Sequence, residues 1–328
     1  MPHTLRSKII GTGSYAPRKT LTNDDLAAIV ETSDAWILSR TGIKERRVAV
    51  SDSSTGMAVK AAKAALKAAE LSAKDIDLVI VGTVTPEMIF PSTACFVQSE
   101  LGVRGGSAAF DVSAACSGFL FALDTADKYI RTGAAKKALV IGVDKFSRIV
   151  DWQDRSTCVL FGDGAGAAVL SASSGSRGLL ASRVHSDGRG WEMLYAPGAV
   201  RPSRFEDGVR AEEPYIKMNG NETFKIAVRT MERAVTEAIE SSGLTKGDVS
   251  LLVPHQANMR IIKAIKERMG LADEQVVMNL DRYGNTSAGS IPLALDEAVR
   301  EGRVKDGDVI VFVAFGGGLT WASAVVRW

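Results

Sequence analysis

The sequence repeats one pattern at a long, constant spacing, and this duplication limits the possible folds more than any other feature. Phe121-Ala122-Leu123-Asp124 resembles Leu293-Ala294-Leu295-Asp296, and Leu139-Val140-Ile141-Gly142 resembles Val311-Phe312-Val313-Ala314. The spacing is 172 residues in both cases. A period this long, shared by separate elements, indicates duplication of a large βαβ-type half rather than a short solenoid repeat. We therefore predict two equivalent halves, residues 1–175 and 176–328.

Each half is predicted to be an α/β unit. Amphipathic helices over 57–71 and 224–244 each lead into an apolar strand, within 74–82 and 246–254. Near-continuous apolar strands separated by helices are typical of largely parallel sheets that are covered on both faces. The helix predicted over 117–131 would form a buried middle layer, which gives a five-layer αβαβα body. The polar, poorly periodic segment 188–214 is predicted to be a loop, with 198–214 as a lid over a pocket.

Composition narrows the classes of function. A chain of 328 residues with 46% apolar residues can bury a large core, and a formal net charge of +2 gives no strong field for nucleic acid. The N-terminal residues contain no apolar signal-peptide region, and no apolar run approaches the ~18–20 residues that a membrane span needs. Three cysteines without disulfide-framework spacing favour a reducing, cytoplasmic location.

Cys116 is the candidate nucleophile. It lies between a predicted strand, 108–112, and the start of the predicted middle helix. The partial positive charge of a helix N-terminus would lower the pKa of its thiol and favour the reactive thiolate. The alternative is that Cys116 is a small packing residue, which is common for free cysteine and is our interpretation of Cys95 and Cys158.

Two further polar side chains are predicted at the ends of core strands. His255 follows the strand 249–254, and Asn285 lies in Gly284-Asn285-Thr286. Together they could donate two N–H groups to one oxygen and stabilise an enolate, each by a factor of roughly 10²–10³. A lone histidine is more often structural, and an asparagine beside glycine is common in turns. The run 315–320 contains three glycines, which suit either backbone donors to a ligand or a tight turn between strands.

Other motifs carry less weight. Gly11-Thr12-Gly13 lacks the third glycine of a dinucleotide fingerprint, and the run 162–166 lacks the lysine of a phosphate-binding loop. No cluster has metal-ligand spacing, so neither a metal nor another cofactor is expected. Arg260, Lys263 and Lys266 form a basic stripe that could dock an acidic partner, with Lys225 adding to it.

The sequence resembles the β-ketoacyl-[acyl-carrier-protein] synthase III family of thiolase-like condensing enzymes. The resemblance runs from Ile9 to Val326, nearly the whole chain. It is most specific in Ala114-Ala115-Cys116-Ser117-Gly118, in Pro254-His255-Gln256-Ala257-Asn258, in Gly284-Asn285-Thr286-Ser287-Ala288 and in Phe315-Gly316-Gly317-Gly318. It implies a thiolase-like duplicated fold whose N-terminal half carries the cysteine and whose C-terminal half carries the histidine and asparagine.

The resemblance also implies roles for individual residues. Cys116, His255 and Asn285 would form the catalytic triad; Gly317, with the backbone of Cys116, would bind an acyl oxyanion, and Phe315 would pack beside a malonyl group. Phe90 would enter the acyl pocket of a homodimer partner. The residues implied to bind coenzyme A are Thr32, Trp36, Arg40, Arg155, Gly220, Phe224, Ala257 and Asn258, with Trp36 and Arg155 on either side of the adenine. Those implied to dock acyl carrier protein are Gln256, Arg260, Lys263 and Lys225.

The implied reaction joins an acyl-CoA primer to malonyl-acyl-carrier protein with loss of CO₂. The primer, whether acetyl, branched or longer, is left open. Three alternatives also remain at this point. They are a secondary-metabolism relative that uses malonyl-CoA or longer acyl groups, a papain-like peptidase, which has the same Cys, His, Asn order, and a carrier-protein binder without catalysis.

Overall fold

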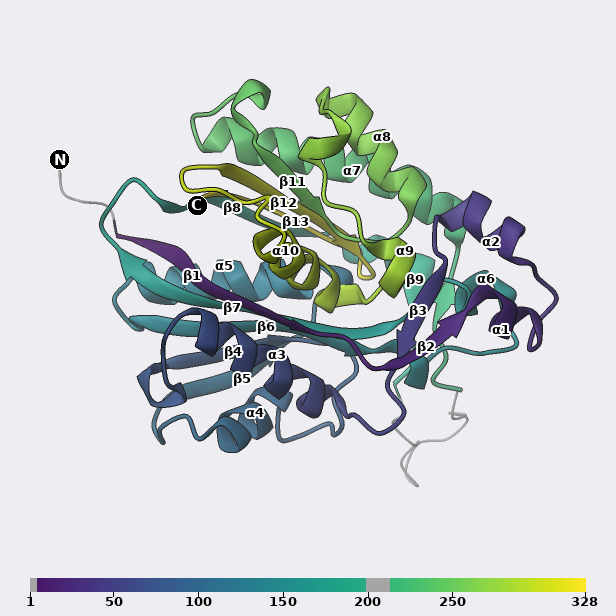
Figure 1. The fold of residues 1–328 in the computed structure, drawn as a ribbon, viewed down its shortest axis with the longest axis horizontal. Helices are drawn as coiled ribbons and strands as arrows, with labels where there is room; N and C mark the ends of the chain where they lie inside the picture. The colour runs from purple at the N-terminus through teal and green to yellow at the C-terminus, as the bar shows by residue number, and fades with distance from the viewer. Residues whose placement is uncertain (1–4, 199–212) are drawn as a thin grey trace.

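The computed structural model describes residues 5–198 and 213–328. Its first sheet has the strand order β1-β7-β6-β4-β5 (Figure 1). The strands are β1 (Arg6–Tyr15), β7 (Asp163–Ser173), β6 (Lys137–Lys145), β4 (Leu78–Gly82) and β5 (Ala108–Val112). Every residue of β4 is buried, as expected for a strand covered on both faces.

The second sheet repeats this order. It runs β8-β13-β12-β11, with β8 (Gly178–Ser186), β13 (Thr320–Arg327), β12 (Val309–Gly316) and β11 (Leu251–Pro254). An isolated parallel bridge from Leu252 to Val276 occupies the place that β5 has in the first sheet. β7 ends at Ser173 and β8 begins at Gly178, so the chain passes from the first sheet to the second between these residues. The division into halves 1–175 and 176–328 stays a prediction.

Both sheets are mixed, so the prediction of largely parallel sheets was wrong. β4 pairs in parallel with β5 and β6, and β11 pairs in parallel with β12, but β7 and β13 are antiparallel to their neighbours. The connection between β12 and β13 is the glycine-rich run Gly317-Gly318-Leu319, which is too short for a parallel crossover. This run is therefore a tight turn as well as part of a cavity wall.

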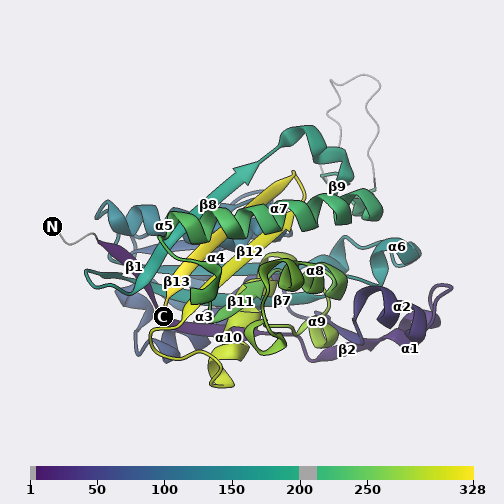
Figure 2. The same cartoon turned by 90° about the horizontal axis from the view of Figure 1, so that it is seen from above.

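Helices complete five layers. α3 (Ser54–Ala68) and α4 (Thr93–Leu101) cover the outer face of the first sheet, and α7 (Gly220–Ser241) and α8 (Met259–Met269) cover that of the second (Figure 1). Figure 2 shows α7 lying across β8, β13 and β12. The middle layer, between the sheets, is α5 (Gly118–Arg131) and α10 (Ser290–Arg300). The predicted αβαβα architecture and the buried helix at 117–131 are thus confirmed.

Smaller elements gather at one end of the layers (Figure 2). β2 (Lys19–Thr22) and β3 (Glu45–Val48) pair in an antiparallel manner, and α1 (Asn23–Ala27) and α2 (Asp34–Thr41) lie between them in the chain. The short helices α6 (Arg155–Cys158) and α9 (Leu280–Tyr283) belong to the same end.

The segment predicted to be a loop, 188–214, is partly regular. A 3-10 helix, Gly188–Met193, leads into β9 (Leu194–Tyr195), which pairs with β10 (Lys217–Met218). Residues 199–212, most of the predicted lid, lie outside the described residues. No described helix combines the length and the apolar character that crossing a membrane requires.

Candidate functional site

Two equivalent turns meet at the centre of the molecule. Cys116 lies in a 3-10 turn, Ala115–Ser117, that joins β5 to α5, and the turn Ser287–Gly289 leads into α10. The two turns keep the spacing of 172 residues. Ala115 and Ser287 occupy the same position in them and both have left-handed backbones, with φ of 45° and 50°. Such angles are uncommon outside glycine and cluster at functional sites.

The Cys116 thiol is buried and has a polar partner. Its exposed fraction is 5%, and the Ser287 hydroxyl donates a hydrogen bond to its sulfur, with 3.5 Å between Oγ and Sγ. Burial raises the pKa of the Cys116 thiol to about 12, whereas the hydrogen bond from Ser287 acts to lower it. The prediction of a lowered thiol pKa was therefore wrong, because desolvation outweighs the hydrogen bond from Ser287.

His255 follows β11 and is also buried, at 2% exposure. Its Nδ1 lies 2.7 Å from the hydroxyl oxygen of Ser290, the first residue of α10. Burial lowers the pKa of the imidazole from 6.5 to about 3. His255 is therefore neutral throughout the physiological pH range, and a neutral imidazole has one N–H donor.

Asn285 is held in a fixed orientation. Its backbone N–H donates to the backbone carbonyl of Leu160 at 2.9 Å. Its backbone carbonyl accepts from the backbone N–H of Gly162 at 3.0 Å. The backbone N–H of Ser287 donates to Oδ1 of Asn285 at 2.8 Å. Because that donor requires the carbonyl oxygen of the amide, the Nδ2 group remains available to donate elsewhere.

One cavity brings the three side chains together. Its volume is about 240 Å³, and Cys116, His255, Asn285 and Phe315 contribute to its wall. Four of the residues implied to bind coenzyme A line the same cavity, together with Arg260: they are Gly220, Phe224, Ala257 and Asn258. The cavity thus extends from the thiol to residues of α7 and of the start of α8.

A second, larger cavity lies on the other side of Cys116. It has a volume of about 840 Å³ and is lined mainly by apolar side chains, with Gly317 beside Cys116. A Cβ atom at Gly317 would collide with the carbonyl oxygen of Leu194, which explains the requirement for glycine. Phe90 lies at the rim and is 82% exposed. The arrangement suits an apolar acyl chain attached to the sulfur.

The implied adenine site is closed in this structure. The guanidinium carbons of Arg155 and Arg40 lie 4.9 and 5.1 Å from the ring centre of Trp36. A ring placed between Trp36 and Arg155 needs two contacts of roughly 3.5 Å each, about 7 Å in total. Arg155 must therefore move before the two side chains can enclose a base. Thr32 has a buried hydroxyl without a hydrogen-bond partner among the described residues.

The basic stripe is only partly available to a partner. Arg260 is exposed and lies over the ring of Phe224, at 5.1 Å, and Lys263 is also exposed. Lys225 pairs with Glu222 and Lys266 pairs with Asp273, so both charges are partly neutralised. Arg260 and Lys263 are the stronger candidates for contact with an acidic protein.

Gln256 does not belong to a docking surface, which corrects the sequence prediction. It is 1% exposed, and its Nε2 donates to the carbonyls of Pro254 and Val277 at 2.8 and 3.1 Å. Its Oε1 accepts from the backbone N–H of Asn279 at 3.0 Å. Through these bonds the Gln256 side chain connects the end of β11, next to His255, to residues 277–279, which precede α9 and Asn285.

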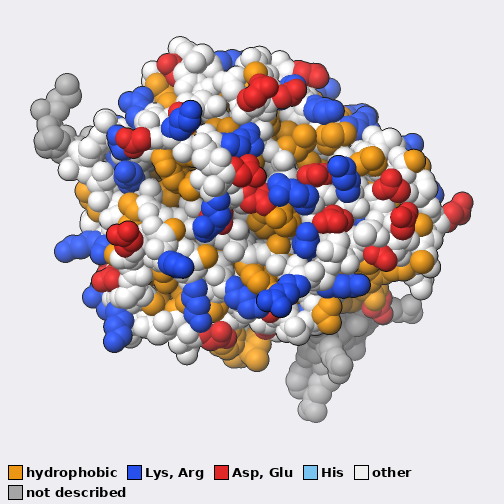
Figure 3. Space-filling model, in the orientation of Figure 1, with side chains coloured by type: hydrophobic (Ala, Val, Ile, Leu, Met, Phe, Trp, Pro, Cys, Tyr) orange, Lys and Arg blue, Asp and Glu red, His pale blue; other side chains and the backbone are white. Residues whose placement is uncertain are grey.

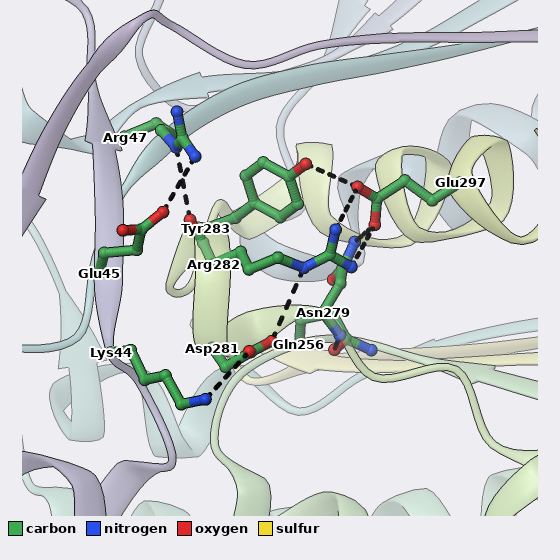
Figure 4. Close-up of polar contacts among 9 residues, drawn as sticks. All are labelled: Lys44, Glu45, Arg47, Gln256, Asn279, Asp281, Arg282, Tyr283 and Glu297. Atoms are coloured by element: carbon green, nitrogen blue, oxygen red, sulfur yellow. Dashed lines mark hydrogen bonds and ion pairs between the residues drawn. The ribbon is translucent and has the colours of Figure 1, made fainter.

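That segment is tied to α10 by one carboxylate (Figure 4). Glu297 accepts from Asn279 Nδ2 and from the Tyr283 hydroxyl, each at 2.6 Å, and from both terminal nitrogens of Arg282, at 3.2 and 3.1 Å. Three residues on one side of the site thus donate to the same carboxylate. This network fixes α9, two residues before Asn285.

Several of these supporting residues were not predicted from the sequence. Ser287 lies within the Gly284–Ala288 motif, and Ser290 lies two residues after it. A hydroxyl side chain next to an apolar helix could have indicated a buried hydrogen-bond partner. Asp144 was not identified at all. It is buried, and it accepts from Val84 N, from the hydroxyls of Thr83 and Thr85 and from the backbone N–H of Ala288. Its role depends on long-range contacts that periodicity does not reveal.

Among residues 5–198 and 213–328, no group of three or more His, Cys, Asp or Glu side chains is placed to hold a metal ion.

Comparison with known proteins identifies the family. Residues 110–188 match the family model described as 3-oxoacyl-[acyl-carrier-protein (ACP)] synthase III, and residues 239–328 match that of its C-terminal region. The chain is 53% identical over 323 residues to the beta-ketoacyl-[acyl-carrier-protein] synthase III of Alkalilimnicola ehrlichii, across 98% of this chain and 99% of that one. The chain belongs to the 3-oxoacyl-[acyl-carrier-protein] synthase III family.

Solved structures of 3-oxoacyl-[acyl-carrier-protein] synthases III have the same fold. That of the Aquifex aeolicus protein superimposes with a TM-score of 0.92 at 52% identity, covering 98% of this chain and 100% of that one. The priming beta-ketosynthase from the R1128 polyketide biosynthetic pathway is less similar, at 35% identity and a TM-score of 0.90, covering 98% and 96%. The thiolase-like fold and a condensing, acyl-transferring activity are thus confirmed. The secondary-metabolism alternative is not favoured, and the peptidase and non-catalytic alternatives fall away.

Proposed function

We propose that this chain catalyses the first condensation of fatty acid synthesis, joining an acyl-CoA primer to malonyl-acyl-carrier protein. The observation that carries the residue assignment is the shared cavity of Cys116, His255 and Asn285, since a nucleophile and two N–H donors converge there. Membership of the 3-oxoacyl-[acyl-carrier-protein] synthase III family is the support for the class of reaction.

In the first half-reaction the Cys116 sulfur attacks the acyl carbon of acyl-CoA. The carbon–sulfur bond to coenzyme A breaks, coenzyme A leaves with a proton as the free thiol, and the acyl group stays on Cys116. We assign the backbone N–H groups of Cys116 and Gly317 to the oxyanion that forms in between. Support comes from the close approach of the two segments, because a Cβ at Gly316 would collide with the backbone nitrogen of Cys116.

In the second half-reaction the malonyl thioester loses CO₂. The electron pair of the broken bond generates an enolate, whose oxygen accepts hydrogen bonds from His255 and Asn285. The enolate carbon then attacks the Cys116 thioester and forms the new carbon–carbon bond, which frees the cysteine thiolate. The lowered pKa of His255 keeps the imidazole neutral near pH 7, so it would donate to the enolate oxygen through a single N–H group.

The partners follow from the same assignment. Arg260, which is exposed and lines the 240 Å³ cavity, and Lys263, exposed one turn further along α8, are assigned to the acidic carrier protein. The α2 and α6 residues around Trp36 are assigned to coenzyme A. On the face shown in Figure 3, Lys and Arg side chains are interspersed with Asp and Glu, so docking rests on a local patch. The three free cysteines agree with the cytoplasm as the location. In this proposal coenzyme A thioesters are substrates and not a bound cofactor.

A homodimer is part of the proposal. Met88, Ile89 and Phe90 are 55, 82 and 82% exposed at the rim of the acyl cavity, and large apolar side chains exposed together indicate an interface. Phe90 of a second copy would then close the acyl cavity. Analytical ultracentrifugation tests this directly: a monomer at micromolar concentration would contradict it.

Intact-mass measurement after incubation with a panel of acyl-CoAs tests the catalytic assignment and reveals the primer. The wild type should gain one acyl group, Cys116→Ala none, and Cys95→Ala, the control, one. Asn285→Ala should still acylate but form no 3-oxoacyl product with malonyl-carrier protein. Normal acylation of Cys116→Ala would refute the assignment. Replacing malonyl-carrier protein by malonyl-CoA separates this function from the secondary-metabolism alternative.

A further inference from the structure

Ser290 contacts the ring nitrogen of His255 that faces away from the thiol cavity. Its hydroxyl oxygen lies 2.7 Å from Nδ1 of His255 and 3.4 Å from the backbone nitrogen of Gln256. All three residues are at most 2% exposed. Buried polar groups are almost always hydrogen-bonded, so the direction of each bond can be worked out.

The direction follows from which atoms carry hydrogens. The backbone N–H of Gln256 can only donate, so the Ser290 oxygen accepts from it. The Ser290 hydroxyl hydrogen then needs an acceptor, and within the described residues Nδ1 of His255 is the one within hydrogen-bonding distance. If Nδ1 carried the proton instead, the Ser290 oxygen would receive two donors and its own hydrogen would stay buried without an acceptor, which costs about 1–3 kcal/mol.

We propose that Ser290 is a positioning residue that holds His255 as the tautomer protonated on Nε2. This inference rests on the proposed function, in which His255 donates to the enolate oxygen. With Nδ1 tied to the start of α10, Nε2 is the ring nitrogen left for the cavity that His255 shares with Cys116 and Asn285. A proton on Nε2 makes that nitrogen a donor; a proton on Nδ1 would present a lone pair to the enolate oxygen and repel it.

The arrangement also explains how the two halves of the molecule cooperate in this step. Ser290 directly follows the turn Ser287–Gly289, so the turn that contacts the Cys116 sulfur is continuous with the helix that orients His255. Nε2 then joins Nδ2 of Asn285 as the second N–H group. Ser290 touches neither substrate in this scheme and acts through His255.

The chain is well suited to a direct test, because it has three histidines, His3, His185 and His255. Nitrogen-15 NMR of protein labelled at histidine distinguishes the protonated from the bare ring nitrogen, and His255→Asn identifies the His255 signals by their loss. The wild type should show His255 protonated on Nε2. Ser290→Ala should shift the signals toward the Nδ1-protonated form. An unchanged tautomer in Ser290→Ala would overturn the proposal.

Kinetics of the two half-reactions give the second measurement. In Ser290→Ala the condensation rate should fall about 10- to 100-fold, by analogy with the loss of a partner that orients a metal-binding histidine. Acylation of Cys116 should stay within about twofold. Ser323→Ala is the matched control, since Ser323 is 1% exposed and its hydroxyl has no partner among the described residues. This control should retain both rates.

Failure of the inference and failure of the proposed function give different results. If His255→Asn abolishes condensation while Ser290→Ala condenses at the wild-type rate, Ser290 has no positioning role and the proposed function stands. If His255→Asn condenses normally, the donor role of His255 is refuted, and the inference with it. Equal losses of acylation and condensation in Ser290→Ala would also overturn it, because they indicate general structural damage.

Discussion

The hydroxyl of Ser287 donates to the sulfur of Cys116 across the interface between the two halves, at 3.5 Å. Both residues lie in the paired turns that the duplication generates, and both are buried. The hydrogen bond opposes the effect of burial on the pKa of the thiol. It is therefore the contact most directly connected with nucleophile reactivity.

Removing that hydroxyl should slow acylation. Ser287→Ala leaves the backbone N–H that orients Asn285, but the thiol pKa should rise further and the thiolate fraction should fall. We expect acylation about tenfold slower, the equivalent of one pKa unit. A time course of intact mass with limiting acyl-CoA measures this, with Ser323→Ala as the control. Wild-type acylation in Ser287→Ala would contradict it.

The rate of acylation should rise with pH without levelling off. The thiolate is the nucleophile, and with the thiol pKa raised to about 12 the working pH lies well below it. The thiolate fraction then grows about tenfold per pH unit between roughly pH 7 and 9. Stopped-flow detection of released coenzyme A measures the profile, and circular dichroism at each pH checks that the protein stays folded. A plateau near pH 8 would contradict the raised pKa.

Protonation of His255 should not limit condensation on the acid side. An ordinary histidine becomes charged as pH falls through 6.5, whereas the pKa of His255 is lowered to about 3. The unfolded chain binds a proton at this residue between pH 6.5 and 3 and the folded chain does not, so His255 makes folding less stable as pH falls through that window. The condensation rate of pre-acylated enzyme, measured from pH 5.5 to 7.5, should show no step centred at 6.5. Such a step would indicate an exposed imidazole.

Trp36→Ala should affect one substrate only. Malonyl-carrier protein has no adenine, so the change should raise KM for acyl-CoA and leave KM for malonyl-carrier protein unchanged. Loss of aromatic stacking on one base costs about 1–3 kcal/mol, so we expect an increase of at least about fivefold. Steady-state kinetics with each substrate varied in turn test this. Parallel increases in both KM values would mean that Trp36 acts on the fold around α2 instead.

Glu297→Gln should destabilise the protein. Asn279, Arg282 and Tyr283 all donate to this carboxylate, and hydrogen bonds to a charged group contribute more than neutral ones. We expect a loss of about 2 kcal/mol in the free energy of unfolding, measured by urea denaturation. Glu301→Gln, an exposed residue directly after α10, is the control. Equal stability of the two variants would show that the network contributes little.

Most of the fold could be predicted from the sequence, because hydrophobic periodicity and a constant 172-residue spacing are written along the chain. The helix at 117–131 was recognised as a middle layer from its apolar character, and it spans Gly118–Arg131. The antiparallel direction of β7 was not recognised, because an apolar run looks the same in either direction. For β13, a tight turn within 315–320 was already one of the two interpretations of the glycine run. Only the length of the connection, as between β12 and β13, decides the direction.

The candidate site also has features that could be predicted from the sequence and features that could not. The sequence by itself determined which residues stand at strand ends and that two of the turns are equivalent, since order and spacing are properties of the chain. Tertiary structure decided the rest: the raised pKa of Cys116, the inward position of Gln256, the contact between Trp36 and Arg155, and the contact between Ser290 and His255. Desolvation and hydrogen-bond partners come from residues far apart in sequence, which local pattern does not encode.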